Sequence, residues 1–292
     1  MGGSPKKPSP SAADHFDIER FREALRTHSF ARMVRYNFST ASTNADALTS
    51  LHQHPNPGNL HGMAILAEQQ TAGRGRRGRI WHSPAQGNIY CSVVMVQRAG
   101  SSQHGFFLSW IPLFSALAVA DCLSDQSGVA VSVKWPNDLL IGDKKLGGIL
   151  CEQTSVAENT VAIVIGIGLN VNADRESFPR ELRSGATSLA LECGRTLDRA
   201  MILADLFYRL EQRMDRLGLE GPAGMIDEFT LRCATLGKRV QVTLEPQGVV
   251  QGLAESIGPD GCLCLRPLMG ASAADPGSLM EIRSADVVHL RG

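Results

Sequence analysis

Short runs of alternating hydrophobic and polar residues cover most of the chain, with longer runs of helical spacing between them. A period of two residues predicts a strand, whereas a period near 3.6 residues predicts an amphipathic helix. The patterns predict strands at residues 62–68, 88–96, 131–135, 139–141, 145–151 and 160–171, and helices at residues 16–35, 106–125, 198–217 and 223–233. Pro112 either kinks the second of these helices or begins its regular part. From about Tyr36 onward the order of elements indicates a mixed α/β fold.

The pattern changes at Leu236 and Gly237, beyond which only short alternating runs occur, broken by glycine and proline. These runs lie at residues 239–244, 248–257, 262–266 and 280–283. Such spacing is typical of a small β-barrel appended to a larger domain. We therefore expect a tail at residues 1–15, a main domain at 16–235 and a C-terminal domain at 236–292.

Composition narrows the class of protein. Lys plus Arg and Asp plus Glu both total 29, so no global field favours nucleic acid or an anionic membrane. No stretch approaches the roughly 18–20 apolar residues of a membrane span, and the Pro/Ser/Lys-rich start, expected to be disordered, lacks a signal-peptide core. The seven cysteines form no CxxC pair, which argues against a disulfide framework or zinc site and for a reducing compartment. These features indicate a soluble cytoplasmic protein.

The most informative segment is residues 73–79, hereafter the arginine loop, with four arginines and three glycines directly after a predicted strand. It is too charged for a core and too rich in glycine for a stable helix. Its backbone amides and guanidinium groups can surround an anion. We expect it to be mobile without its ligand and to order around a phosphate or carboxylate.

The sequence of the arginine loop allows three other interpretations. Gly73, Gly75 and Gly78 match the GxGxxG dinucleotide fingerprint, but that motif requires a following helix, and a predicted strand follows here. RNA-binding arginine–glycine segments usually repeat in disordered tails, whereas this one occurs once between strands. A solvated basic turn is the remaining alternative.

Further motifs carry less information singly. Residues 134–138 (Lys-Trp-Pro-Asn-Asp) combine a cation, an aromatic ring and a rigid bend, which alone is most often a structural turn. Lys145 opens the returning arm of a hairpin that turns at Gly142 and Asp143. The glycines of residues 166–170 weaken a strand, so close approach of a ligand is one explanation. Residues 42–44 (Ser-Thr-Asn) either cap a helix or hold a polar ligand at its start.

In this order the segments resemble the biotin–protein ligase family, with matching motifs at residues 42–44, 67–70, 73–81, 134–138, 145–150 and 166–170. The resemblance spans roughly residues 36 to 290. It implies an α+β fold, with a mixed-sheet catalytic domain related to class II aminoacyl-tRNA synthetases and an SH3-like C-terminal domain. Some members also carry an N-terminal winged helix that binds DNA. Only about 35 residues precede the catalytic pattern here, so we expect a monofunctional ligase without operator binding.

The resemblance implies a biotin–[acetyl-CoA-carboxylase] ligase. Such an enzyme converts biotin and ATP to biotinyl-5'-AMP, releasing pyrophosphate, and transfers biotin to a lysine of a biotin carboxyl carrier protein. Mg²⁺ is expected with ATP, and a homodimer formed through sheet edges is left open. The alternatives are a lipoate–protein ligase and a non-catalytic module that binds the carrier or RNA.

The matching motifs also imply roles for individual residues. Biotin is expected at Ser42, Thr43, Asn44, Gln70, Arg74, Gly75, Arg76, Lys145 and Gly148. ATP is expected at Arg74, Arg76, Arg77, Arg79, Trp81, Asn137, Asn170 and Arg283. Arg76, Lys145 and Asp138 are the expected catalytic residues. In the first step two anions must meet, and cationic side chains favour this. In the second step the acceptor lysine, whose ordinary pKa is about 10.4, must lose a proton, and Asp138 is the candidate base.

Overall fold

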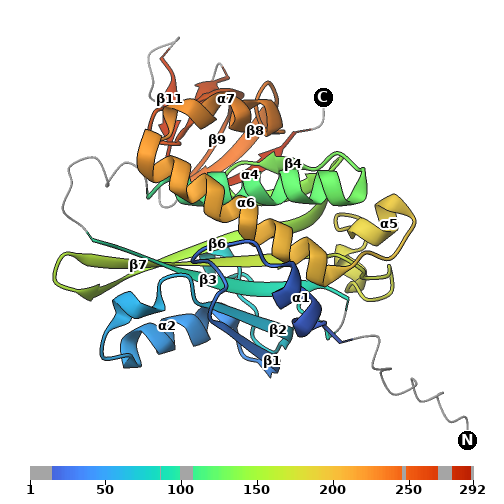
Figure 1. Ribbon diagram of the computed structural model, residues 1–292. Coiled ribbons are helices and arrows are strands. Elements are labelled where there is room, and N and C mark those ends of the chain that lie inside the picture. The colour runs from blue at the N-terminus through green and yellow to red at the C-terminus, as the bar shows by residue number, and fades with distance from the viewer. Residues whose placement is uncertain (1–14, 86, 99–107, 245–247, 269–277, 291–292) are drawn as a thin grey trace, which may run out of the picture.

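The computed structural model describes residues 15–85, 87–98, 108–244, 248–268 and 278–290. Within them the chain forms a seven-stranded sheet flanked by helices and a five-stranded sheet near the C-terminus (Figure 1). The predicted tail lies outside the described residues except for its last position. The boundary expected near residue 235 stays a prediction, and the second sheet begins at Arg239.

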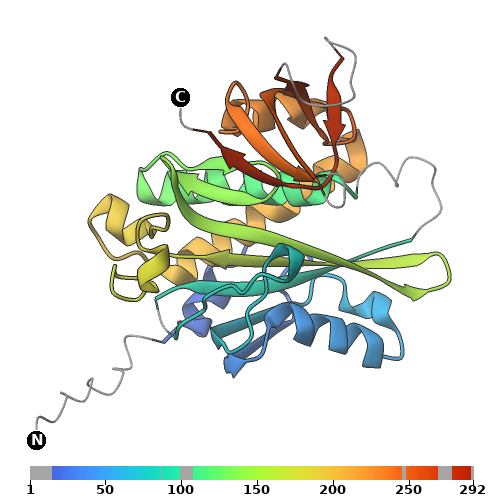
Figure 2. The ribbon, with the colours of Figure 1, turned by 180° about the vertical axis from the view of Figure 1, so that it is seen from behind.

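The larger sheet is mixed, as the resemblance implied. Its strand order is β1-β2-β3-β7-β6-β5-β4, in which β1 and β2 are parallel and the other neighbours are antiparallel. The strands are β1 (Val34–Thr40), β2 (Ala64–Gln70), β3 (Ile89–Arg98), β4 (Ser132–Lys134), β5 (Asp138–Ile141), β6 (Lys144–Ala157) and β7 (Thr160–Leu169). The predicted hairpin is confirmed as β5 and β6, with Gly142 at a φ of 57° in its turn. Figure 2 shows β6 and β7 extending together beyond their neighbours.

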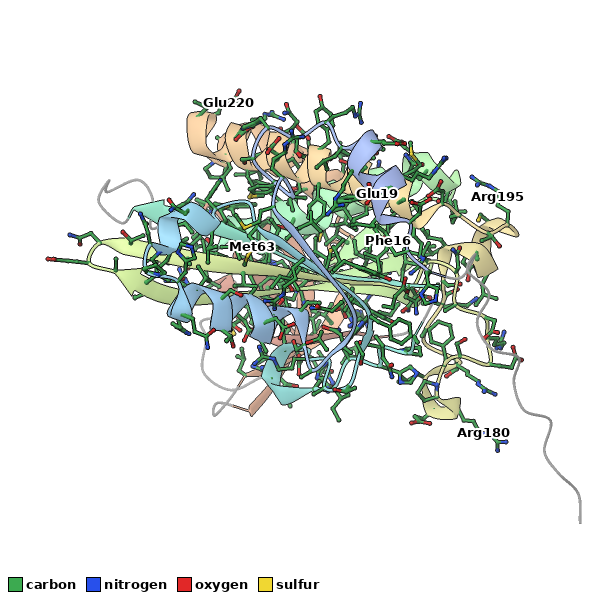
Figure 3. All side chains as sticks on the ribbon, turned by 60° about the horizontal axis from the view of Figure 1, so that its bottom comes forward. Phe16, Glu19, Met63, Arg180, Arg195 and Glu220 are labelled. Atoms are coloured by element: carbon green, nitrogen blue, oxygen red, sulfur yellow. The ribbon has the colours of Figure 1, made fainter. Side chains whose placement is uncertain are left out.

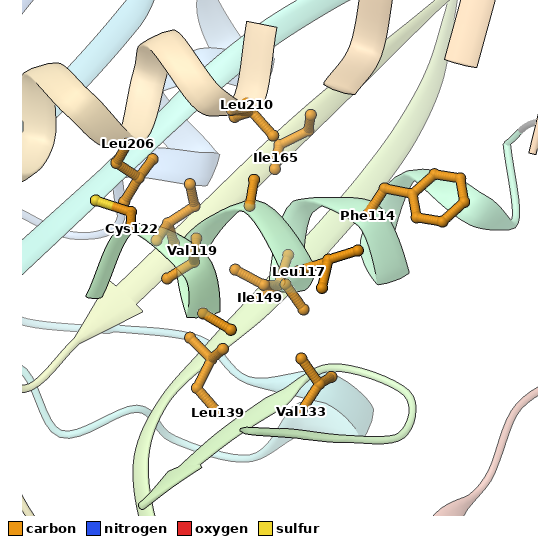
Figure 4. Packing of buried hydrophobic residues seen from close by; sticks show 14 of the residues in the cluster. Phe114, Leu117, Val119, Cys122, Val133, Leu139, Ile149, Ile165, Leu206 and Leu210 are labelled. Atoms are coloured by element: carbon orange, nitrogen blue, oxygen red, sulfur yellow. The ribbon is translucent and has the colours of Figure 1, made fainter. Parts of the chain in front are cut away.

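Helices cover both faces of this sheet. α4 (Trp110–Ser127) and α6 (Arg199–Glu220) pack on one face, and α2 (Thr43–Gln53) packs on the other, which Figure 3 shows from the side of α2. Alternate residues of β2 serve the two layers, since Ala64 and Leu66 join the larger core and Ile65 joins the core under α2. α4 is buried nearly all round, between the sheet and α6 (Figure 4). Pro112 lies in its first turn, so it begins the helix rather than kinks it.

The short helix expected in residues 16–35 is present, but it covers only part of that range. α1 (Ile18–Ala24) is a two-turn helix, and the chain then runs irregularly to β1. The carboxylate of Glu211 on α6 is only 1% exposed and accepts the backbone N–H groups of His28, Ser29 and Phe30. A distant acceptor therefore replaces the helical hydrogen bonds, which periodicity along the chain does not predict.

The remaining elements are short helices, 3-10 turns and the strands of the second sheet. The helices and turns are α5 (Leu189–Cys193), α7 (Ala223–Arg232), and the short 3-10 turns Pro57–Leu60, Arg76–Gly78 and Arg180–Leu182. The second sheet has the order β11-β10-β9-β8-β12. Its strands are β8 (Arg239–Leu244), β9 (Gly248–Ile257), β10 (Leu263–Pro267), β11 (Met280–Ile282) and β12 (Asp286–His289). The first four match the predicted runs closely, and β12 was not predicted.

Two buried tryptophans fasten the C-terminal sheet to the main body. The indole N–H of Trp110 donates to the carbonyl of Pro259 at 2.9 Å, and that of Trp135 donates to the carbonyl of Gly261 at 3.0 Å. A buried indole N–H requires such a partner. These two bonds hold the connection between β9 and β10 against the start of α4 and against the turn that contains Trp135.

The seven cysteines are free thiols, and five of them are buried. Burial raises the pKa of Cys151 to about 12. No helix in the described ranges is long and apolar enough to cross a membrane.

Acid sensitivity is expected from Glu211. Burial alone would raise its pKa, but the N–H groups of Phe30, His28 and Ser29 lower it below its ordinary 4.5. A carboxyl group whose pKa falls on folding stabilises the folded state above the unfolded-state pKa, and this contribution is lost as pH falls through the folded-state pKa. Glu211→Gln should therefore lower the free energy of unfolding at pH 7 by about 2 kcal/mol and flatten its fall below about pH 5.

Urea unfolding between pH 7 and pH 3.5 checks this expectation, with Glu19→Gln as control because Glu19 is an exposed glutamate on α1. Parallel pH profiles for the wild type and Glu211→Gln would contradict the role given to Glu211.

Candidate active site

A cavity of about 250 Å³ opens between the start of α2, the arginine loop, the hairpin strands and the C-terminal sheet. All nine residues predicted for biotin line it, together with Arg79, Trp81, Asn137 and Asp138 from the other predicted sets. The motifs that are far apart in the sequence therefore surround one space.

The floor of the cavity is a closed hydrogen-bond network at the start of α2. Gln70 accepts the backbone N–H and the hydroxyl of Thr43 at 2.9 and 3.2 Å, and its amide donates to Ser83 at 3.0 Å. The hydroxyl of Ser92 lies 2.7 Å from that of Thr43 and 2.6 Å from Asn44 Oδ1. Ser42 is the N-cap residue but makes no side-chain capping bond, so its hydroxyl is available to a ligand.

The glycines of residues 166–170 are explained by the protein's own side chains. A Cβ at Gly166 would lie 2.1 Å from Asn44 Oδ1, and one at Gly168 would lie 2.6 Å from the indole nitrogen of Trp81. Both distances are far below normal contact, so only glycine lets Asn44 and Trp81 lie on the backbone of β7. Close approach of a ligand was one explanation for these glycines, whereas in the structure two protein side chains make the close approach.

The arginine loop is a tight turn. Trp81 N–H donates to Gly73 O at 2.9 Å and Gly75 N–H donates to Arg79 O at 2.7 Å, while Arg77 adopts a left-handed φ of 56°. The chain continues into β3 without a helix, which rules out the dinucleotide fingerprint.

The loop's arginines bind partners in both sheets. Arg74 pairs with Glu152 of β6 at 2.9 Å. Arg76 donates to Asn137 at 3.2 Å and to Ser284 at 3.0 Å. Two further arginines of the loop, Arg77 and Arg79, pair with Asp286 of β12.

Positive charge concentrates where these elements meet. Lys145 Nζ lies 2.7 Å from Asp138 Oδ1 and 5.4 Å from the centre of the Trp81 ring. Burial, and next the neighbouring Arg77, lower the pKa of Arg76. Burial likewise lowers the pKa of Lys134; Asp138 opposes this shift and Lys145 adds to it. An anion entering here would relieve the repulsion among these cations.

A second cavity of about 270 Å³ adjoins the first beside Trp81. It is lined by Ile80, Trp81, His82 and Pro84, by Asn170, and by the segment around Phe178 and Leu182. Trp81 and Lys145 line both cavities, so the lysine stands where the two spaces meet.

Three residues predicted for ATP are placed differently from the rest. Asn170 lines only the second cavity and donates to the carbonyl of Thr187 at 3.0 Å. Arg77 faces the C-terminal sheet. Arg283 lies outside both cavities, where it pairs with Asp260 and Glu281, so this arrangement does not bring it to a phosphate site.

Sequence reasoning missed several residues of the site. Lys134 belongs to the motif at residues 134–138 but was assigned no role, although it lines the cavity. Ser284 and Asp286 lie within three residues of Arg283 in the matching segment, but only Arg283 was assigned a role. Glu152, which accepts hydrogen bonds from Arg74 and Asn44, lies two residues after the motif at residues 145–150.

Gly166→Ala should distort the floor of the cavity. Its Cβ would overlap Asn44, whose short side chain is held by Ser92, and overpacking of this kind lowers stability by about 1–3 kcal/mol. Chemical denaturation measures the loss. Gly218→Ala is the control, because nothing lies within 4 Å of its Cβ on α6. Equal stability of the two variants would show that Asn44 is not tightly held.

Comparison with known proteins identifies the family. Residues 39–170 match the family model described as the biotin/lipoate A/B protein ligase family. The chain is 37% identical to a biotin--[acetyl-CoA-carboxylase] ligase of Mycobacterium tuberculosis over 86% of this chain and 87% of that protein. It is 34% identical to the Paracoccus denitrificans ligase of the same name over 78% and 91%.

Other relatives mark the limits of the likeness. The chain spans 57% of the length of the bifunctional ligase/repressor BirA of Bacillus subtilis, with 32% identity. The biotin protein ligase from Aquifex aeolicus in complex with biotin and ATP has the same fold, with a TM-score of 0.71 and 24% identity over 89% of this chain and 100% of that one. The motifs, the fold and these relatives together show that the chain belongs to the biotin protein ligase family.

Proposed function

We propose that this chain is a biotin–[acetyl-CoA-carboxylase] ligase. It would activate biotin as biotinyl-5'-AMP and transfer biotin to a lysine of a biotin carboxyl carrier protein. The observation that carries the proposal is the position of Lys145 beside Trp81, where these two residues line both cavities. Two substrates can then present their anionic groups to the same lysine from opposite sides. The names of the Mycobacterium and Paracoccus relatives support the reaction, and the Aquifex complex supports the two substrates.

Biotin would enter the first cavity with its ureido ring at the start of α2. The ring has one acceptor oxygen and two N–H donors, and a buried group left unpaired costs about 1–3 kcal/mol. Ser42 has a hydroxyl not used for capping, and the carboxamide of Gln70 is held in one orientation by Thr43 and Ser83. The carboxylate at the other end would then face Lys145 and the arginine loop.

ATP would place adenine in the second cavity, beside Trp81 and Asn170. Its phosphates would point toward Lys145 and the arginines at the junction. Leu182 and Phe178 supply the apolar surface that a base requires.

The first step is attack of the biotin carboxylate on the α-phosphate, with pyrophosphate leaving. A carboxylate is already a nucleophile and needs no base, so the chain must chiefly bring two anions together. Lys145, Arg76 and Arg79 would neutralise them, with Asp138 holding Lys145 in place. The arginine loop would then cover the adenylate and exclude water.

Mg²⁺ would accompany ATP rather than occupy a protein site. No cluster of three or more His, Cys, Asp or Glu side chains in the described ranges could hold a metal ion. Mg²⁺ commonly binds substrate phosphates with few protein ligands, so no step here depends on a protein-held ion.

In the second step the carrier lysine attacks the carbonyl carbon of the mixed anhydride. A C–N bond forms, the C–O bond to phosphate breaks, AMP leaves and the amine loses a proton. Asp138 would orient or deprotonate this amine, since it lies beside the junction on the strand that faces Lys145.

Lipoate is the nearest alternative acid, because lipoate ligases share the matched family model. Its dithiolane ring has no N–H or carbonyl groups to pair with Ser42, Thr43 and Gln70 at the cavity floor. A polar floor that lacks partners is unfavourable, which favours biotin.

Biotin-dependent exchange of labelled pyrophosphate into ATP tests the adenylation step. We expect exchange with biotin and none with lipoate. Lys145→Ala should reduce exchange at least about 100-fold, because the barrier rises when an anion-neutralising group is lost.

Lys144→Ala is the matched control, since Lys144 is adjacent in sequence but pairs with Glu192 outside the cavity. Exchange that Lys145→Ala leaves intact, or that lipoate supports equally, would contradict the proposal. No exchange with either acid would favour a binding module.

Asp138→Asn should slow the second step more than the first. Single-turnover transfer from preformed biotinyl-5'-AMP to a carrier domain should fall by about 100-fold, since general-base catalysis contributes roughly 100- to 10,000-fold. Unchanged transfer by the variant would show that Asp138 only holds Lys145.

A further inference from the structure

Glu152 lies on β6 just behind the cavity wall without lining the cavity itself. Its side chain is 25% exposed, and its Oε2 atom accepts two donors from opposite parts of the site. Asn44 Nδ2 lies 2.7 Å away and Arg74 NH2 lies 2.9 Å away. One carboxylate oxygen therefore joins the start of α2 to the first arginine of the arginine loop.

The contact with Asn44 completes the orientation of its amide. Nδ2 also donates to Leu150 O at 3.2 Å, while Oδ1 accepts the hydroxyl of Ser92 at 2.6 Å. The amide rests on Gly166, where even a methyl group has no room. Because both ends of the amide are used, Asn44 serves to fix the first turn of α2 rather than to bind a ligand directly.

The contact with Arg74 ties the loop's stem to the sheet. Arg74 forms an isolated antiparallel bridge with Ile80, so it stands where the two arms of the loop close. Without Glu152 its guanidinium group, 44% exposed, would lose its carboxylate partner. The stem would then keep its backbone bonds and, further along the loop, the pairing of Arg77 and Arg79 with Asp286.

We propose that Glu152 is a positioning residue for the biotin end of the cavity, acting through Asn44 and Arg74. The inference rests on the proposed function, since it concerns the same cavity. Glu152 is separate from the reacting groups, because its side chain bonds to Asn44 and Arg74. Lys145 and Asp138 instead pair with each other, and Lys145 lies near the start of β6. Loss of Glu152 should weaken biotin binding more than it impairs the use of ATP.

The experiment measures the biotin Kd of the intact chain by titration calorimetry and the KM for ATP by pyrophosphate exchange. Glu152→Ala should raise the biotin Kd by about tenfold or more, because Asn44 and Arg74 each lose a hydrogen bond to the charged carboxylate. The ATP KM should rise by less than the biotin Kd, because Asn44, one of the two side chains that Glu152 holds, is expected at biotin alone, whereas Arg74 is expected at both substrates. Glu255→Ala is the control, since Glu255 forms an ion pair with Arg266 on the second sheet, outside both cavities.

A second variant separates the two routes. Glu152→Gln keeps an acceptor for Asn44 but removes the charge that holds Arg74, so its Kd should lie between those of the wild type and Glu152→Ala. In an Arg74→Ala background, Glu152→Gln should have almost no further effect, because its partner is already gone.

The outcomes are distinct. A biotin Kd within about twofold of wild type for Glu152→Ala would overturn the inference. Equal increases in the biotin Kd and the ATP KM, together with a lowered Tm, would also overturn it, because they indicate a merely structural role. If Glu152→Ala does not fold, the same criteria are applied to Glu152→Gln. Failure of the wild-type chain to bind biotin would overturn the proposed function as well, whereas wild-type binding with an unaffected Glu152→Ala would overturn this inference alone.

Discussion

Strand β7 carries two glycines whose missing side chains let Asn44 and Trp81 lie directly against the sheet. The rest of the site depends on that close approach. Asn44 sets the first turn of α2, and with it the floor of the first cavity. Trp81 stands between the two cavities and lies under the ammonium group of Lys145. A methyl group at either glycine would push one of these walls away from the sheet.

Above this floor the chain gathers several cationic side chains, although its overall net charge is zero. Lys134, Lys145 and the arginine loop meet over the cavities, while carboxylates from three elements hold them in place. Glu152 secures the loop to the large sheet and Asp286 secures it to the small one. The small sheet is thereby part of the site, because Ala285 to Val288 line the first cavity.

Much of this arrangement could be predicted from local patterns. Strand and helix periods depend on neighbouring residues, so β8 and β9 were predicted to the residue, and the motifs pointed to a common site. Contacts between distant segments could not be predicted in this way. Glu211 replaces helical bonds at residues 28–30, and Asp286 reaches the arginine loop from nearly the end of the chain. For the same reason Arg283, expected at the phosphates on a loose match, lies with Asp260 instead.

A crystal structure of the chain with a non-hydrolysable biotinyl-adenylate analogue would show where the two ends of the adenylate bind. We expect the ureido ring beside Ser42 and Gln70, adenine beside Asn170, and the linking group at Lys145, with Trp81 between the two ends. Binding with both ends on the same side of Trp81, or away from Lys145, would contradict this expectation.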